Sequence, residues 1–293
     1  MKEVIFYEVI NNRIININLR WITMKKPNIA LTIAGTDPSG GAGIMADLKS
    51  FHASGVYGMA VATSIVSQNS LGVQDVYHLP VEVIESQLRS VFDDEVPHAI
   101  KTGMIASEEM MQTIKPFIEQ SGKPYVIDPV MVAKSGDALM DDEGKGKLKE
   151  ILLPLATVVT PNIPEAEDIT GFKIQTEEEI KKAGAFFLNE IGSKGVVIKG
   201  GHLEGDAIDY LFTENGVKSW KSERFNTKHT HGTGCTFSAV ITAELAKGHT
   251  IEEAVEVAKR FITLAIQYTP EIGKGRGPVN HFAYQKIEGL DYE

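Results

Sequence analysis

From Asn28 onward, short apolar runs alternate with longer amphipathic stretches along the chain. This alternation is typical of an α/β fold, in which a mostly parallel sheet is covered by helices. Asn215-Gly216 lies between two strand-like runs and predicts a hairpin, so a small part of the sheet should be antiparallel. The expected strands are 29–34, 61–66, 99–102, 125–128, 157–160 and 196–199, and the expected helices are 42–53, 81–92, 108–120, 143–153, 177–191, 235–246 and 251–267.

Residues 1–23 differ from the rest of the chain, because they hold six isoleucines and four asparagines but no glycine, proline or alanine. They lack the cleavage site and the compact apolar core of a secretory signal. We therefore expect residues 1–23 to be a disordered leader that precedes a true start at Met24. The alternative is a flexible N-terminal extension. Residues 24–293 show no repeat or linker and should form a single domain.

The composition excludes several classes of protein. Of the 293 residues, 43% are hydrophobic, which is enough for one large core, yet no apolar run is long enough to cross a membrane. The formal net charge of −10 argues against nucleic-acid binding, although lysines and a metal ion could still neutralise a nucleotide substrate locally. The lone cysteine, Cys235, excludes an intrachain disulfide and fits a cytoplasmic location.

Glycine and polar residues gather where the predicted strands end. Because ligands of open α/β sheets bind at the carboxyl ends of the strands, these segments should meet at one edge. The segments are 35–43, 68–69, 102–104, 128–130, 160–162 and 199–201. The first is rich in glycine, but it lacks the Lys-Ser/Thr pair of a P-loop and the G-x-G-x-x-G spacing, so a tight turn explains it equally well.

The segment 231–236, His-Gly-Thr-Gly-Cys-Thr, predicts a glycine turn that leads into a buried helix. Backbone N–H groups at a helix start attract phosphate, and the same terminus should lower the pKa of Cys235. Cys235 could be an inert core residue, a nucleophile with His231 as its base, or a general base at an anion hole. No Asn or Asp that would orient His231 is evident. His229 and His231 lack a third ligand at metal spacing, so we interpret them as loop residues.

Polar residues at other strand ends each have a functional and a structural interpretation. Asn162 and Glu165 could hold a hydrated Mg2+ through water, but their spacing is also that of a helix cap, which the pair alone favours. Lys199 could neutralise a transferring phosphate or simply be solvated. The amide of Gln68 could bind a heterocycle or belong to an ordinary loop.

Together and in this order, the motifs closely resemble the hydroxymethylpyrimidine/phosphomethylpyrimidine kinases of thiamine biosynthesis, in the ribokinase-like superfamily. The motifs are 34–43, 101–104, 128–131, 160–165, 199–202 and 231–235, and the resemblance spans residues 28–283. It implies a three-layer α/β/α sandwich and a homodimer. It also implies ATP-dependent phosphorylation of 4-amino-5-hydroxymethyl-2-methylpyrimidine and then of its monophosphate, with Mg2+. It leaves a monovalent-cation requirement open.

The resemblance also implies a role for single residues. Gln68 would bind the pyrimidine, in a pocket lined by Gly35, Asp47, Met104 and Val130. Some relatives carry glutamate at the position of Gln68, which puts in doubt how the amino group of the pyrimidine is held.

The remaining motif residues would bind ATP and carry out the transfer. Gly232, Gly234 and Cys235 would belong to an anion hole, with Cys235 at the position of the catalytic base. Asn162 and Glu165 would hold Mg2+, and Lys199 would face the ATP phosphates. Sugar kinases carry aspartate in place of the cysteine, so the cysteine indicates the pyrimidine/pyridoxal branch. A pyridoxal kinase or a dual-specificity enzyme is the alternative. A non-catalytic sensor and a cysteine acyl-transfer hydrolase are rivals from other classes.

Overall fold

The structure, a computed structural model, describes residues 5–10, 13–18, 26–131, 140, 142–200 and 207–288. Its central sheet contains β3 (Ile29–Ala34), β4 (Tyr57–Ala62), β7 (Ala99–Thr102), β8 (Tyr125–Ile127), β9 (Val158–Val159), β10 (Gly195–Lys199), β11 (Ala207–Thr213) and β12 (Gly216–Ser222). The eight strands lie in the order β12-β11-β10-β9-β8-β7-β3-β4. The strands from β4 to β10 in this order pair in parallel, whereas β10, β11 and β12 pair antiparallel. The predicted hairpin between β11 and β12 is confirmed.

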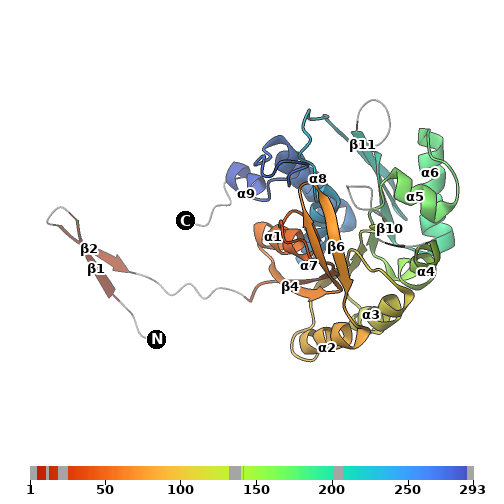
Figure 1. The fold of residues 1–293 in the computed structure, drawn as a ribbon. Helices are drawn as coiled ribbons and strands as arrows, with labels where there is room; N and C mark the ends of the chain where they lie inside the picture. The colour runs from red at the N-terminus through yellow and green to blue at the C-terminus, as the bar shows by residue number, and fades with distance from the viewer. Residues whose placement is uncertain are drawn as a thin grey trace.

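Helices cover both faces of the sheet and make three layers (Figure 1). One apolar core includes residues of α2 (Val81–Phe92), α3 (Glu108–Ser121), α4 (Asp142–Ile151), α5 (Ile163–Thr170) and α6 (Glu177–Phe186), and the other those of α1 (Gly43–Ala53), α7 (Thr233–Ala246) and α8 (Ile251–Gln267). Successive residues of a strand point to opposite faces. Leu31 and Ile33 of β3 accordingly lie in the first core, and Ala30 lies in the second. The expected α/β/α sandwich with a mainly parallel sheet is confirmed.

Periodicity predicted the long helices better than the short elements. The predicted helices 81–92 and 251–267 coincide with α2 and α8, whereas α5, α9 (Ala283–Glu288) and β6 (Gly72–His78) had no counterpart. The prediction of one strand at 61–66 is wrong. The chain leaves the main sheet after Ala62 and enters β5 (Ser64–Asn69), which pairs antiparallel with β6. The change of direction falls at Thr63 and Ser64, and no glycine or proline marks it, so the pattern does not reveal the break.

The segment where a leader is expected contains a separate two-stranded sheet (Figure 1). There β1 (Ile5–Ile10) pairs antiparallel with β2 (Arg13–Asn18). The start at Met24 and the domain boundary at that residue stay predictions. Among the helices that the structure describes, none is both long and apolar enough to span a bilayer.

Candidate active site

The segments that follow the parallel strands meet at the carboxyl edge of the sheet, as the sequence predicts. The N–H of Gly103, which follows β7, donates to the carbonyl of Ile33 in β3 at 3.1 Å. The N–H of Asp128, which follows β8, donates to the carbonyl of Thr102 in β7 at 3.0 Å. Further along the edge, the N–H of Lys199 donates to Pro161 at 2.9 Å. These bonds join neighbouring strand ends into one continuous surface.

The glycine turn at this edge begins α7. Gly232 is the N-cap, with a φ of 77°, and among the described residues no side chain caps this helix. A side chain at Gly232 would be strained by that φ and would overlap the carbonyl oxygen of Gly41. The turn therefore needs glycine for two reasons, and it packs directly on the loop 35–43. The N–H of Thr233 donates to the carbonyl of Thr230 at 3.4 Å, and the other N–H groups of this first turn suit an anion or water, as the sequence predicts.

A histidine and an aspartate join these two loops. Nε2 of His231 lies 2.7 Å from Oδ2 of Asp37, and the Asp37 side chain is fully buried. Asp37 also accepts hydrogen bonds from the N–H of Ser39 at 2.8 Å and of Ala42 at 2.8 Å. Burial alone would raise the pKa of Asp37, but the hydrogen bonds from His231 and Ser39 lower it overall. The sequence interpretation of His231 as an unpartnered loop residue missed this contact because the two residues are 194 positions apart.

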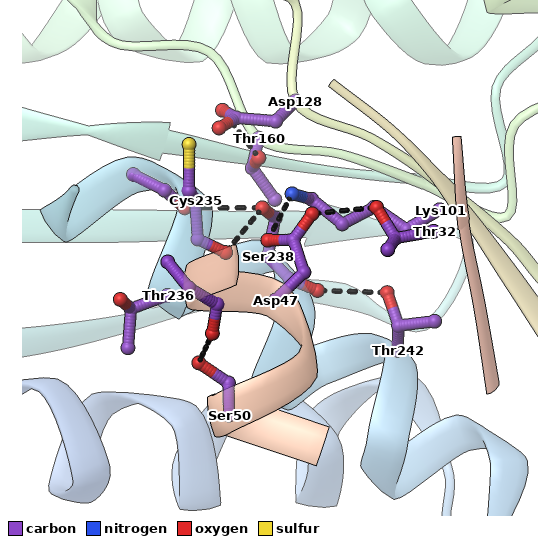
Figure 2. Close-up of polar contacts among 12 residues, drawn as sticks. Thr32, Asp47, Ser50, Lys101, Asp128, Thr160, Cys235, Thr236, Ser238 and Thr242 are labelled. Carbon is purple, nitrogen blue, oxygen red and sulfur yellow. Dashed lines mark hydrogen bonds and ion pairs between the residues drawn. The ribbon is translucent and has the colours of Figure 1, made fainter. Parts of the chain in front are cut away.

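Cys235 is half-buried on the first turn of α7 (Figure 2). Burial raises the pKa of its thiol to about 12, and Lys101 opposes this shift, as does the hydrogen bond that the N–H of Gly43 donates to the sulfur. The carboxylates of Asp128 and Asp47 reinforce the rise. The expectation that the helix start lowers the pKa of Cys235 is therefore wrong, because loss of water around the sulfur outweighs the favourable dipole and ammonium.

Asp47 lies beneath Cys235 in a buried ion pair. Its Oδ1 lies 2.6 Å from Nζ of Lys101, and its Oδ2 accepts a hydrogen bond from Thr32 at 2.6 Å. Neither side chain of the ion pair is exposed, so the carboxylate of Asp47 is directed at Lys101 rather than at a ligand (Figure 2). Lys101 was not among the predicted site residues. A lysine inside the buried strand 99–102 was the signal that could have identified it.

Lys199 and Asp128 flank the glycine turn from the sheet. Nζ of Lys199 lies 3.3 Å from Oδ1 of Asp128, and a Cβ placed on Gly234 would lie 3.4 Å from the lysine and 3.3 Å from the carboxylate. Burial alone would lower the pKa of Lys199, but Asp128 and Glu165 raise it, so the ammonium stays charged. Asp128 appeared in a motif of the sequence without a predicted role, and the structure places it between Lys199 and the start of α7.

Asn162 and Glu165 form the helix cap that their spacing favours. Oδ1 of Asn162 accepts the N–H of Glu165 at 2.9 Å, and Oε2 of Glu165 accepts the N–H of Asn162 at 2.8 Å. No group of three or more His, Cys, Asp or Glu side chains in the described part of the chain could hold a metal ion. A Mg2+ ion that keeps its waters and binds substrate phosphates needs only one or two carboxylates, so Glu165 fits such an ion through water.

The residues expected around the pyrimidine lie at the other end of the same edge. A Cβ on Gly35 would lie 3.0 Å from Cε of Met104, so these two residues are adjacent. Gln68 on β5 directs Nε2 at the carbonyl of Thr36 at 3.5 Å, and Val130 follows Asp128 by two residues. The structure thus brings Gly35, Met104 and Gln68 together. Two surface hollows, over α2 and between β12 and α8, include none of the predicted site residues.

The mainly parallel α/β/α sandwich, with an uncapped helix start at its carboxyl edge, is the fold of the ribokinase-like kinases. The family model for phosphomethylpyrimidine kinase matches residues 37–280. The chain is 66% identical over 273 residues to the hydroxymethylpyrimidine/phosphomethylpyrimidine kinase of Staphylococcus aureus strain MSSA476, which covers 92% of this chain and 99% of that protein. The chain belongs to the phosphomethylpyrimidine kinase family, and the predicted kinase activity is confirmed.

The solved structures that resemble this chain include two kinds of kinase, and their similarity to it is comparable. The phosphomethylpyrimidine kinase of Clostridium difficile 630 superposes with a TM-score of 0.74 at 46% identity, over 82% of this chain and 99% of that one. The pyridoxal kinase of Staphylococcus aureus, in complex with AMP-PCP and pyridoxal, superposes with a TM-score of 0.83 at 37% identity, over 90% and 96%. The fold is therefore shared by both kinds.

Proposed function

We propose that this chain transfers a phosphoryl group from ATP to 4-amino-5-hydroxymethyl-2-methylpyrimidine and then to its monophosphate, in thiamine biosynthesis. The names of the most similar curated relatives support these substrates. The observation that carries the proposal is the start of α7, where a glycine turn faces Lys199 and bears Cys235. Such a site suits phosphoryl transfer, which depends on positioning and charge neutralisation more than on covalent help.

In the first step, the thiolate of Cys235 would take the proton of the substrate hydroxyl. The hydroxyl oxygen then bonds to the γ-phosphorus of ATP while the bond from that phosphorus to ADP breaks. The N–H groups from Gly232 to Cys235 would stabilise the charge on the transferred group, and Lys199 would neutralise phosphate oxygens. Because the thiol pKa is about 12, little thiolate exists at neutral pH, so the rate of this step should rise with pH.

The second step needs no comparable base. Its acceptor is a phosphate whose second pKa is about 6, so the attacking oxygen is already largely ionised at neutral pH. Mg2+, held through water by Asn162 and Glu165, would neutralise charge on the ATP phosphates in both steps. The pocket of Gln68, Gly35, Met104 and Val130 would hold the ring in both, and Asp47 would support that pocket from below.

ADP release by the purified chain tests the proposal. Each reaction contains ATP, Mg2+ and one acceptor: the pyrimidine alcohol, its monophosphate or pyridoxal. We expect turnover of the first two, with a kcat/KM at least tenfold above that for pyridoxal. Thermal stabilisation by the pyrimidine with no ADP release would overturn the proposal and indicate a non-catalytic sensor. Omitting Mg2+, or exchanging Na+ for K+, measures the ion requirements.

A second candidate function is phosphorylation of pyridoxal, alone or beside the pyrimidine. The TM-score of 0.83 to the Staphylococcus aureus pyridoxal kinase, higher than the 0.74 to the Clostridium difficile phosphomethylpyrimidine kinase, favours keeping it. Direct competition between pyridoxal and the pyrimidine alcohol in one reaction measures the preference. Exclusive turnover of pyridoxal would reverse our assignment.

We further infer that the enzyme is a cytoplasmic homodimer. Large apolar side chains are exposed at Tyr57 of β4 and on the hairpin of β5 and β6, where Ile65 and Tyr77 are register partners and Leu71 lies in the turn. Exposed apolar groups that lie together favour contact with another protein surface. Light scattering after size exclusion should give twice the chain mass of 32.0 kDa, and Ile65→Lys should shift it toward the single mass.

A further inference from the structure

The phosphoryl transfer described above assigns no role to the charges of the ion pair between Lys101 and Asp47. Both side chains are fully buried and their charged atoms lie 2.6 Å apart. Taking two charges out of water is unfavourable, and a packed apolar pair of similar volume is often no less stable. The pair therefore calls for an explanation other than stability.

The sheet register explains how the pair is held. Thr32 of β3 and Lys101 of β7 are register partners, as are Ala30 and Ala99 two residues earlier. All four residues face the α1 and α7 layer, because Ala30 and Ala99 belong to the core on that side. Asp47 of α1 reaches down to this pair of neighbours, accepting from Thr32 and Lys101 at 2.6 Å each. The ammonium is thus fixed from three secondary-structure elements.

The side chain of Lys101 runs from β7 toward Cys235 and Ser238 in the first turns of α7 (Figure 2). Burial alone would lower the pKa of Lys101, but Asp47, Cys235 and Asp128 raise it, so it stays charged. The groups that act on the Cys235 sulfur are Lys101 from β7, Asp128 from the end of β8, and Asp47 and the Gly43 N–H from α1. Lys199 of β10 is paired with Asp128. Of these four groups in the described structure, Lys101 is the one with a positively charged side chain.

We propose that Lys101, held by Asp47 and Thr32, is a positioning residue that sets the proton affinity of Cys235. Its ammonium favours the thiolate, and the negative charge of Asp47 beside it limits that effect. The consequence for catalysis rests on the proposed role of Cys235 as base. The effect on thiol acidity does not rest on it, because acidity is a property of the protein without substrate.

The lone cysteine makes the proposal directly measurable. Alkylation by iodoacetamide proceeds through the thiolate, so its rate from pH 7 to pH 10 reports the acidity of Cys235 without interference from another thiol. The two members of the pair should act in opposite directions. At a given pH, Lys101→Met should slow alkylation about tenfold, and Asp47→Asn should accelerate it about tenfold, since one pKa unit changes the thiolate fraction tenfold.

Glu244→Gln is the matched control. Glu244 is a buried carboxylate near the other end of α7, where it pairs with Lys247 and His249. Its neutralisation should change the alkylation rate less than twofold. Should Lys101→Met fail to fold, Asp47→Asn decides alone, because the amide keeps the shape of the carboxylate. Equal rates in Asp47→Asn and the unaltered protein, or slower alkylation, would overturn the proposal.

Activity assays separate this proposal from the proposed function. Asp47→Asn should also raise the rate of the first phosphorylation at neutral pH relative to that of the second. If Cys235→Ala slowed neither phosphorylation relative to the unaltered protein, the role of Cys235 as base would be wrong. Opposite shifts of the alkylation rate in Lys101→Met and Asp47→Asn would still support the effect of Lys101 on thiol acidity. If alkylation did not respond while Cys235→Ala slowed the first step, the electrostatic role of Lys101 alone would be wrong.

Discussion

Two helices, α5 and α7, begin at the same edge of the sheet, and their first turns are satisfied in opposite ways. In α5, the side chains of Asn162 and Glu165 bind each other's backbone N–H groups. In α7, the N-cap is Gly232, which has no side chain to accept a hydrogen bond, and no other side chain among the described residues caps the helix. Lys199 lies between the first turns of these two helices. It forms an ion pair with Asp128, and the carboxylate of Glu165 also raises its pKa.

The difference separates a helix start that is complete from one that is open. A capping box supplies acceptors from the chain itself, so α5 needs no ligand to satisfy its first N–H groups. An uncapped start leaves these donors to an anion. Chemistry on phosphate therefore belongs to α7, and α5 contributes through its carboxylate and by its position.

The largest expected effect is that of Gly232→Ala. The new Cβ would overlap Gly41 at a φ of 77°, which displaces the donors of the turn. We expect kcat to fall about a thousandfold for both phosphorylations, the scale of a lost anion-hole donor. Gly171→Ala, at the C-terminal end of α5, is the matched control. Its φ is 79° and no described atom lies within 4 Å of the added Cβ, so it should cost about 1 kcal/mol of stability and no activity. Equal activity losses in the two variants would contradict an anion hole at α7.

Cys235→Ala should distinguish the two steps at the open helix start. Single-turnover rates should fall about a hundredfold for the pyrimidine alcohol and less than threefold for its monophosphate, because only the alcohol must lose a proton. In the unaltered protein, the first rate should increase from pH 6 to pH 9, since the thiol pKa is about 12. The second rate should vary little above pH 7. Equal losses would instead indicate a packing or electrostatic role for the cysteine.

Asn162→Ala tests whether the capped start of α5 also binds Mg2+ for the phosphoryl transfer. Loss of the cap should cost about 1 kcal/mol, measured by urea unfolding. Thr250→Ala removes the N-cap of the capping box that begins α8, and it should cost the same. A higher Mg2+ requirement in Asn162→Ala but not in Thr250→Ala would support the metal role. The same Mg2+ dependence in both variants would show that Asn162 acts only as a helix cap.

The smallest effect on phosphoryl transfer should come from the Asp37–His231 contact between the two loops. Asp37→Asn should reduce the free energy of unfolding by about 1–2 kcal/mol at pH 7, because a hydrogen-bonded carboxylate is lost. The folded pKa of Asp37 is lowered, so its stabilisation is full above the ordinary carboxyl pKa and is lost as pH falls through the lowered value. Unfolding at pH 7 and at pH 3 should therefore show the difference between the proteins shrinking in acid.

Local patterns explain why much of the architecture could be predicted. The apolar spacing of α2 and α8 placed both helices with their bounds, and the helix expected at 177–191 begins at the first residue of α6. The start of α7 was predicted as a glycine turn because two glycines next to a small-residue apolar run have few other uses. The change of direction at Thr63 was missed, because neither β4 nor β5 is interrupted by a turn residue there.

The amino-acid sequence by itself determined the alternation of strands and helices, the glycine turn at Cys235 and the family motifs, since each depends on residues that are neighbours along the chain. Only the tertiary structure decided that Asp37 holds His231 and that Asp47 is directed at Lys101. It also decided that the pKa of Cys235 is raised rather than lowered, because the pKa of a thiol depends on how much water and which charges surround it. Contacts across β3, β7, α1 and α7 set these surroundings, and no local pattern records them.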